Sequence, residues 1–177
     1  MRLPRLAAGL LLLPPLLASA QAATDPSLVY ERIQAMVPMR DGVRLETDIY
    51  VPKASKEKLP ILFMRTPYGF DADAQGYSKW LVRPWLQDLL RDGYLLVLQN
   101  VRGRFESEGT FMLERPPRDR RESGSVDEGT DAFDTVDWLL GHVTSNGRVG
   151  MLGVSNPARL VALAMLEHHP AVKAYSP

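Results

Sequence analysis

The chain has 177 residues, 45% of them hydrophobic, and its 21 lysines and arginines are balanced by 21 aspartates and glutamates. Because the charges balance, the sequence lacks the global basic field with which proteins bind nucleic acid or anionic membranes, so neither partner is expected. The absence of cysteine excludes disulfides, thiolate catalysis and cysteine-bound metals.

The first 22 residues are typical of a secretory signal peptide. Arg2 and Arg5 precede an apolar block, Leu6 to Leu17, which small residues follow. This block is shorter than the roughly 20 residues that span a bilayer. We therefore expect residues 1–22 to be cleaved off, leaving residues 23–177 as an exported protein, periplasmic or secreted, with no membrane contact.

The first half of the remaining chain predicts strands with one helix between them. Apolar segments on either side of Asp41-Gly42 indicate an antiparallel hairpin. Short apolar runs at 59–65 and 94–100 are typical of buried strands. Between these runs, apolar residues at helical spacing predict one helix over 80–90.

The second half begins with a long surface loop over 101–126, which we expect to flank a functional site. Arg102 and Arg104 are expected to hold this loop in place through carboxylates. Further helices and strands are predicted at 132–140, 148–152, 160–166 and 171–174. The alternation indicates an α/β fold: a mostly parallel sheet with helices on both faces and ligands at the carboxyl ends of its strands.

Ser155 is the candidate catalytic nucleophile. The segment Arg148 to Ala158 places Gly153-Val154-Ser155 between a buried strand and an apolar helix, as in the nucleophile elbow of an α/β-hydrolase. The alternative is an ordinary helix-capping serine, with Pro157 in the first helical turn. The strand before Ser155 and the helix after it favour the nucleophile.

Two groups are candidates to bind the oxyanion of a serine hydrolase. The backbone N–H of Asn156 follows the nucleophile directly, although Pro157 is expected to push Asn156 towards extended backbone angles. Tyr68 comes just after a predicted strand, where its hydroxyl could be the second donor. The alternative for Tyr68 is a packed side chain at a turn.

The three histidines do not fit the role of a catalytic base. His142 ends one predicted helix, and His168 and His169 are expected to cap the helix that follows Ser155. About 13 residues of helix place them on the order of 20 Å from the Ser155 hydroxyl. This distance excludes direct proton transfer.

No metal and no cofactor are expected. Asp131, Asp134 and Asp137 are interpreted as the solvent-exposed face of an amphipathic helix, with no histidine nearby to complete a metal site. Any catalysis therefore depends on side chains and backbone groups alone.

A set of motifs in a fixed order gives the chain a family resemblance. From about Met36 to Pro177 it resembles the cocaine-esterase-like hydrolases of the X-Pro dipeptidyl-peptidase clan. Around residues 114–128 it looks most like the α-amino-acid ester hydrolases, exported enzymes that cleave or transfer α-amino acyl esters and β-lactam side chains. The motifs are Met39-Arg40-Asp41-Gly42-Val43-Arg44-Leu45, Arg65-Thr66-Pro67-Tyr68, Asn100-Val101-Arg102-Gly103-Arg104, Ser107-Glu108-Gly109, Asp131-Ala132-Phe133-Asp134-Thr135-Val136-Asp137-Trp138-Leu139 and Asn146-Gly147-Arg148-Val149-Gly150-Met151.

The resemblance implies an α/β-hydrolase domain with a helical cap after its sixth strand and a C-terminal jelly roll. It places the nucleophile at Ser155 and the oxyanion donors at Asn156 and Tyr68. The triad acid, the triad histidine, the cap and the jelly roll would all follow Pro177. Residues 23–177 are therefore expected to form the N-terminal part of a truncated α/β-hydrolase domain, which lacks its last strands.

Two departures from the family pattern fall at the elbow itself. The family has Gly-x-Ser-Tyr-x-Gly, whereas this chain has Asn156 for the tyrosine and Ala158 for the last glycine. The acidic cluster with which the relatives hold a substrate amino group has no counterpart among these neutral residues. The resemblance therefore supports ester or amide substrates but not amino-acid ester specificity.

Two hypotheses about function follow. In the first, the chain is part of an exported serine hydrolase that acts on small-molecule esters or amides through an acyl-enzyme, and is inactive as this truncated chain because a triad works as a unit. In the second, it is a non-catalytic truncated product or a binding module. The sequence leaves the oligomeric state open.

Overall fold

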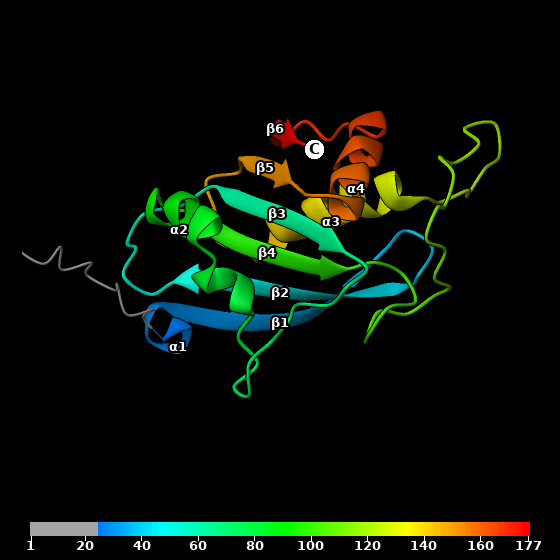
Figure 1. Ribbon diagram of the computed structural model, residues 1–177. Coiled ribbons are helices and arrows are strands. Elements are labelled where there is room, and N and C mark those ends of the chain that lie inside the picture. Colours follow the sequence, from blue (N-terminus) through cyan, green and yellow to red (C-terminus); the bar gives the residue numbers. More distant parts are fainter. Residues whose placement is uncertain (1–24) are drawn as a thin grey trace, which may run out of the picture.

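The computed structural model describes residues 25–177, so the predicted signal peptide, residues 1–22, lies outside the described residues. These residues form one six-stranded sheet with helices packed against it (Figure 1). In chain order the elements are α1 (Pro26–Val29), β1 (Tyr30–Pro38), β2 (Arg44–Pro52), β3 (Ile61–Thr66), the 3-10 helix η1 (Lys79–Val82), α2 (Pro84–Arg91), β4 (Leu95–Asn100), α3 (Glu128–His142), β5 (Val149–Leu152), α4 (Asn156–Leu166) and β6 (Val172–Ser176).

The strands lie in the order β1-β2-β4-β3-β5-β6. The predicted hairpin is confirmed: β1 and β2 pair antiparallel, and Gly42 has the positive φ of 86° that the turn between them needs. β2 also pairs antiparallel with β4, whereas β4, β3, β5 and β6 are mutually parallel. The mostly parallel α/β sheet is therefore confirmed, with an antiparallel hairpin at one end.

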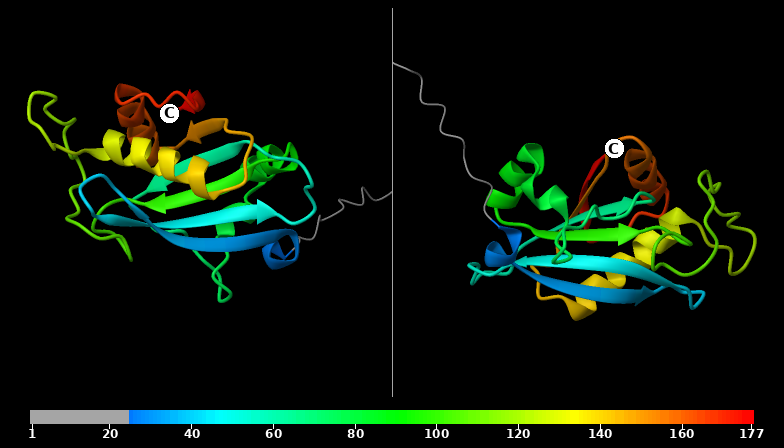
Figure 2. Two further views of the ribbon diagram at one scale, coloured as in Figure 1. Left: turned by 180° about the vertical axis from the view of Figure 1, so that it is seen from behind. Right: turned by 60° about the horizontal axis from the view of Figure 1, so that its bottom comes forward.

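Helices cover both faces of the sheet, as predicted (Figure 2). Along β3, Ile61 and Phe63 face the core that α3 and α4 close, while Leu62 and Met64 face the core beneath η1 and α2. Every residue of β3 and β4 is buried, which explains why both read as continuous apolar runs rather than as an alternating pattern. The central strands are thus held rigidly from two sides.

The helix predicted over 80–90 is broken in two. Arg83 has an extended backbone (φ −73°, ψ 128°), and the helix restarts at Pro84. A proline disfavours helical angles in the residue before it, and it starts a new helix readily because its missing N–H is not needed there.

The helix predicted at 132–140 is confirmed and begins earlier, at Glu128, because its N-terminus has a capping box. The Asp127 side chain accepts from the N–H of Thr130, and the Thr130 side chain accepts from the N–H of Asp127.

Between residues 25 and 177, no helix is both long and apolar enough to span a membrane.

Candidate active site

Ser155 stands at a sharp corner between β5 and α4. Its backbone has φ 64° and ψ −126°, outside the small left-handed well that non-glycine residues use. Such a conformation costs about 1–3 kcal/mol and persists where the surrounding structure enforces it, typically at functional sites. Ser155 is exposed, and its side chain makes no capping hydrogen bond to α4. It thus occupies the capping position without performing the capping function.

Gly153 makes this corner possible. A Cβ at Gly153 would lie 2.3 Å from the carbonyl carbon of Pro157 and 2.6 Å from the backbone nitrogen of Ala158. Real Cβ atoms do not approach so closely, so only glycine lets the end of β5 pass the first turn of α4.

The expectation that Pro157 would pull Asn156 out of the helix is wrong. α4 begins at Asn156, with Pro157 in its first turn. Proline fits there because the first backbone N–H groups of a helix have no partner within it. For the same reason the N–H of Asn156 needs no bond inside α4, and it follows Ser155 directly.

Tyr68 leaves the sheet at the same edge as Ser155. β3 and β5 are parallel neighbours, with Phe63 paired to Met151, so Tyr68 and Ser155 follow that pair by five and four residues. Adjacent strands lie about 4.8 Å apart. Tyr68 is 60% exposed, and its backbone N–H donates to Thr66 Oγ1 at 3.0 Å. This tyrosine is therefore a surface group at a turn, not a packed core residue.

The loop after β4 contacts the Tyr68 turn. Arg104 Nε donates to the carbonyl oxygen of Pro67 at 2.8 Å, and its guanidinium lies over the rings of Phe105 and Phe111. The expectation that Arg104 pairs with carboxylates is therefore wrong. For Arg102 it is confirmed, because that side chain forms ion pairs with Asp41 and Asp131.

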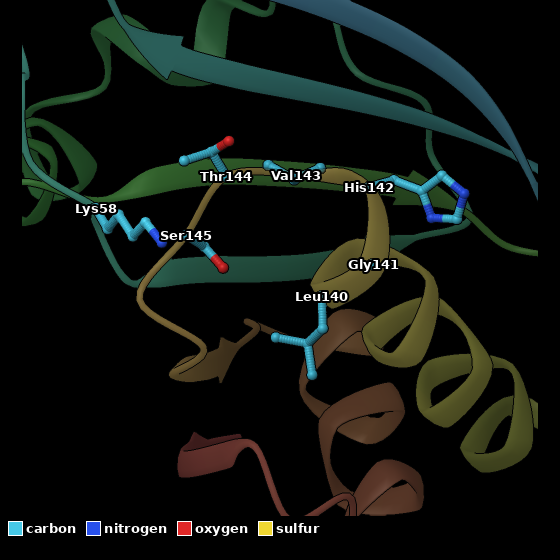
Figure 3. Close-up of a pocket in the computed structure, with 7 residues that line it drawn as sticks. All are labelled: Lys58, Leu140, Gly141, His142, Val143, Thr144 and Ser145. Atoms are coloured by element: carbon cyan, nitrogen blue, oxygen red, sulfur yellow. The ribbon is translucent and has the colours of Figure 1, made fainter.

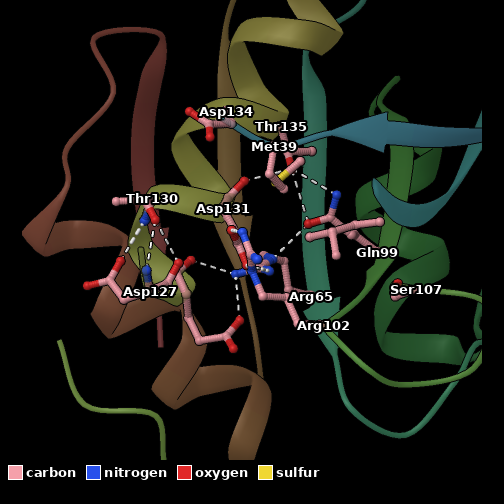
Figure 4. Close-up of polar contacts among 12 residues, drawn as sticks. Met39, Arg65, Gln99, Arg102, Ser107, Asp127, Thr130, Asp131, Asp134 and Thr135 are labelled. Carbon is pink, nitrogen blue, oxygen red and sulfur yellow. Dashed lines mark hydrogen bonds and ion pairs between the residues drawn. The ribbon is translucent and has the colours of Figure 1, made fainter. Parts of the chain in front are cut away.

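A buried charge network lies beneath this edge of the sheet (Figure 4). Arg65, at the end of β3, is fully buried and donates to Gln99 Oε1 at 2.9 Å and to the carbonyl oxygen of Glu128 at 2.6 Å. It also lies 3.5 Å from Asp131, whose side chain is fully buried. The interpretation of Asp131 as solvent-exposed is therefore wrong: its helix turns it inward to meet Arg65 and Arg102.

The network shifts the titration of two of its carboxyl groups in opposite directions. Burial raises the pKa of Glu128, and the attraction of Arg65 opposes this. The hydrogen bonds from Arg102 lower the pKa of Asp41. Sequence reasoning missed the network, although an arginine ending an otherwise apolar buried strand signals a buried partner.

The three histidines bond elsewhere. His142 Nδ1 lies 2.8 Å from the carbonyl oxygen of Trp138 at the end of α3, and His168 Nδ1 lies 3.0 Å from the Tyr175 hydroxyl. His169 accepts from the N–H of Ala171 at Nδ1, so its Nε2 carries the hydrogen that faces Asp137 Oδ1 at 2.8 Å.

The positions of these histidines decide what they can do. The prediction that His168 and His169 cap α4 is wrong, since α4 is closed by the N–H of Glu167. Both lie beyond the far end of α4, whose 11 residues extend about 16 Å from Ser155. Neither of these two can take a proton directly from Ser155.

A depression of about 300 Å³ lies at the other edge of the sheet (Figure 3). Lys58 borders it just before β3, and Ser145 borders it in the turn before β5. The remaining lining residues are Leu140, Gly141, His142, Val143 and Thr144. Because β3 and β5 begin there and end near Tyr68 and Ser155, the depression is not part of the candidate site.

Comparisons with known proteins place the chain among hydrolases. The family described as X-Pro dipeptidyl-peptidase (S15 family) matches residues 41–177. The cocaine esterase of Rhodococcus sp. (strain MB1 Bresler) is 43% identical over 123 residues, which are 68% of this chain and 18% of that protein.

Two solved structures are similar in both sequence and fold. An α-amino acid ester hydrolase is 39% identical with a TM-score of 0.75, and the match covers 91% of this chain and 27% of that one. An aminopeptidase from a marine sediment archaeon, Thaumarchaeota archaeon, is 37% identical with a TM-score of 0.72, covering 82% and 24%. The chain thus spans between 18% and 27% of the length of these relatives.

Proposed function

Because this chain belongs to the X-Pro dipeptidyl-peptidase (S15) family, we propose that it carries the nucleophile of a serine hydrolase that cleaves ester or amide bonds of small molecules. The observation that carries the proposal is Ser155: an exposed hydroxyl, with no capping bond, on a backbone of φ 64° between a strand and a helix. Strain of this kind, without a capping bond to compensate it, supports a chemical role.

The proposed reaction passes through an acyl-enzyme. Ser155 Oγ attacks the carbonyl carbon of the substrate while a base takes the hydroxyl proton, and the carbonyl oxygen becomes an oxyanion. The N–H of Asn156 and the hydroxyl of Tyr68 donate to that oxyanion. The leaving group departs with a proton, and water then cleaves the Ser155 ester and restores the hydroxyl.

Within residues 25–177, no histidine is placed to accept the proton of Ser155. His168 and His169 are beyond reach, and His142 lies at the opposite edge of the sheet with its Nδ1 against Trp138. The 177-residue polypeptide by itself should therefore turn over esters at a rate near background, since a nucleophile without its base loses most of its catalysis.

The same deficit provides a test. Without a base to activate water, an acyl group placed on Ser155 should persist instead of turning over. We expect p-nitrophenyl acetate to acetylate Ser155, and added imidazole, as an external proton acceptor, to speed the acetylation. Because imidazole can also assist the attack of water on the acyl-enzyme, samples are acid-quenched at short times. Mass spectrometry of the peptide that contains Ser155 measures the modification directly.

Two variants make the test specific. Ser155→Ala should remove the modification, while Ser55→Ala, at an exposed serine in an ordinary turn after β2, should leave it unchanged. Acetyl groups spread over lysines and other serines, with Ser155 unmodified at every imidazole concentration, would contradict the proposal. That result would favour a non-catalytic binding module.

We also propose that residues 1–22 export the protein. Expression of the whole chain in a Gram-negative host should yield a periplasmic form whose N-terminal sequence starts at Ala23. Leu11→Arg, which places a charge in the apolar block, should leave the uncleaved chain in the cytoplasm. An uncleaved N-terminus in the periplasmic fraction would contradict the cleavage site.

A further inference from the structure

We propose that Arg104 and Phe105 are positioning residues, which together hold the turn of Tyr68 so that its hydroxyl faces the oxyanion formed at Ser155. This inference rests on the proposed function and adds the part of the chain that places its second donor. Arg104, Tyr68 and Ser155 follow the carboxyl ends of β4, β3 and β5, respectively. These strands are neighbours in that order, so the three loops lie side by side at one edge of the sheet.

Arg104 holds the turn at the residue just before Tyr68. Its Nε donates to the carbonyl oxygen of Pro67 at 2.8 Å. The guanidinium carbon lies 5.3 Å from the ring centre of Phe105 and 5.0 Å from that of Phe111, so two aromatic rings hold the cation in place. A charged donor gives a stronger hydrogen bond than a neutral one, so this contact restrains the turn well.

Phe105 holds the turn at the residue just after Tyr68. A Cβ placed on Gly69 would lie 2.6 Å from Cζ of the Phe105 ring, so the ring lies directly against the backbone of Gly69. Gly69 has φ 82° and Phe105 has φ 53°. Tyr68 therefore lies between two restrained neighbours, one bonded to Arg104 and one covered by Phe105.

The loop that carries both residues is itself anchored to β4. The N–H of Gly103 donates to the carbonyl oxygen of Glu108 at 2.9 Å, and Ser107 Oγ donates to the carbonyl oxygen of Asn100 at 2.9 Å. A Cβ on Gly103 would lie 2.3 Å from the backbone nitrogen of Phe111, so the two arms of the loop are in close contact. These contacts fix Arg104 and Phe105 relative to β4, so both residues can restrain the turn of Tyr68.

Stability alone does not explain Phe105. Phe105 is 57% exposed, so it buries little apolar surface, and a left-handed backbone is costly for a residue with a bulky side chain. Tyr68, at 60% exposed, is similarly short of packing contacts of its own. The exposed ring and left-handed backbone of Phe105, and the exposure of Tyr68, are explained if Phe105 serves to place the Tyr68 hydroxyl.

The first test measures how fast Ser155 reacts with a fluorophosphonate in the presence of imidazole. The Ser155 oxygen forms a bond to phosphorus, fluoride leaves, the proton passes to imidazole, and the phosphoryl oxygen takes the place of the oxyanion. Tyr68→Phe should slow this step by about 100-fold, the usual loss for one oxyanion donor. Arg104→Met should slow it by about 10- to 100-fold through misplacement of Tyr68.

The double variant separates positioning from general damage. If Arg104 acts only through Tyr68, then Arg104→Met in the Tyr68→Phe background should change the rate by less than about twofold. Phe105→Ala should behave as Arg104→Met does, while Phe105→Tyr keeps the ring and should restore the rate. Arg121→Met, which removes an exposed charge that pairs with neighbouring Asp119, serves as the control.

The second test does not depend on chemistry at Ser155. Amide hydrogen exchange at Tyr68 and Gly69 should become at least about tenfold faster in Arg104→Met, while the amides of α3 stay protected. Unchanged exchange at both residues would overturn the inference, and so would multiplicative rate losses in the double variant. If wild-type Ser155 never reacts while exchange responds as expected, the proposed function fails and the structural part of the inference stands.

Discussion

Arg102 and Asp131 form a two-point ion pair inside the protein. Arg102 Nε donates to Asp131 Oδ2 and Arg102 Nη2 donates to Asp131 Oδ1, both at 2.7 Å. The Asp131 side chain is fully buried and that of Arg102 is 5% exposed. Because Arg102 follows β4 and Asp131 lies on α3, this pair joins the site-flanking loop to the helix beneath the sheet.

Removing the Asp131 charge should be strongly destabilising. Asp131→Asn keeps the shape of the side chain but leaves Arg65 and Arg102 with one buried carboxylate fewer. Breaking one side of a buried pair costs about 3–5 kcal/mol of unfolding free energy. Urea denaturation measures this loss.

The control for that prediction lies on the same helix. Asp134→Asn removes a carboxylate that is 14% exposed and whose partner, Arg40, is 39% exposed, so it should cost about 1 kcal/mol, clearly less than Asp131→Asn. Equal losses for the two variants would show that burial of the Asp131 pair does not govern its contribution.

Ionisation of Glu128 should lower the free energy of unfolding as pH rises. Burial raises the pKa of its carboxyl above the ordinary value of 4.5, against the attraction of Arg65. The folded state therefore binds this proton more tightly than the unfolded state does. Its contribution is fully present below the unfolded pKa and is lost as pH rises through the folded pKa.

Glu128→Gln tests that sign, because glutamine stays neutral at every pH. The variant should be as stable as the wild type at about pH 4 and more stable than the wild type at neutral pH. Urea midpoints between these limits measure the difference, with the exposed Glu122→Gln as the control. A variant less stable than the wild type at neutral pH would show that attraction to Arg65 outweighs the cost of burial.

Gly153→Ala should destabilise the corner before α4. Its Cβ would lie 2.3 Å from backbone atoms of Pro157, which cannot move without shifting the helix. Overpacking of this kind costs about 1–3 kcal/mol, occasionally more. Thermal melting compares it with Gly150→Ala in the same strand, where the nearest atom, Leu62 Cδ1, is 4.0 Å away. The Gly150 variant should melt close to the wild type.

Ser155→Gly should be more stable than Ser155→Ala by about 1 kcal/mol, because glycine adopts a positive φ without strain. The opposite order is expected at Ser145, which is not among the positive-φ residues, since glycine there only adds freedom to the unfolded chain. Denaturant titration of the glycine and alanine variants at both positions measures the two stability orders. Equal stability of the two Ser155 variants would mean that the corner stores no strain.

Most of the fold was predictable because local pattern and final environment agree. The apolar runs at 59–65 and 94–100 became β3 and β4, and the turn residues Asp41-Gly42 joined β1 to β2. The family resemblance drawn from ordered motifs is confirmed by the match over residues 41–177. The catalytic roles of Ser155, Asn156 and Tyr68 stay predictions, because no comparison tests them.

The errors arose where a residue's partner is distant in sequence. Asp131 has the spacing of a solvent-facing residue on α3, yet it pairs with Arg65, near the end of β3, and with Arg102, just after β4. Arg104 was expected to pair with carboxylates, but its partner is the backbone carbonyl of Pro67. Helical periodicity describes one helix at a time and does not specify which charges a neighbouring strand will place beneath it.

The amino-acid sequence alone determined the strands, most of the helices, the family and the position of the serine between a strand and a helix. These features depend on residues close together in the chain, through hydrophobic period, turn chemistry and glycine placement. Tertiary structure alone decided that Asp131 is buried and that Arg104 donates to the carbonyl oxygen of Pro67, the residue before Tyr68. Those outcomes depend on strand order, because only the pairing of β4 with β3, and of β3 with β5, brings the three loops to one edge.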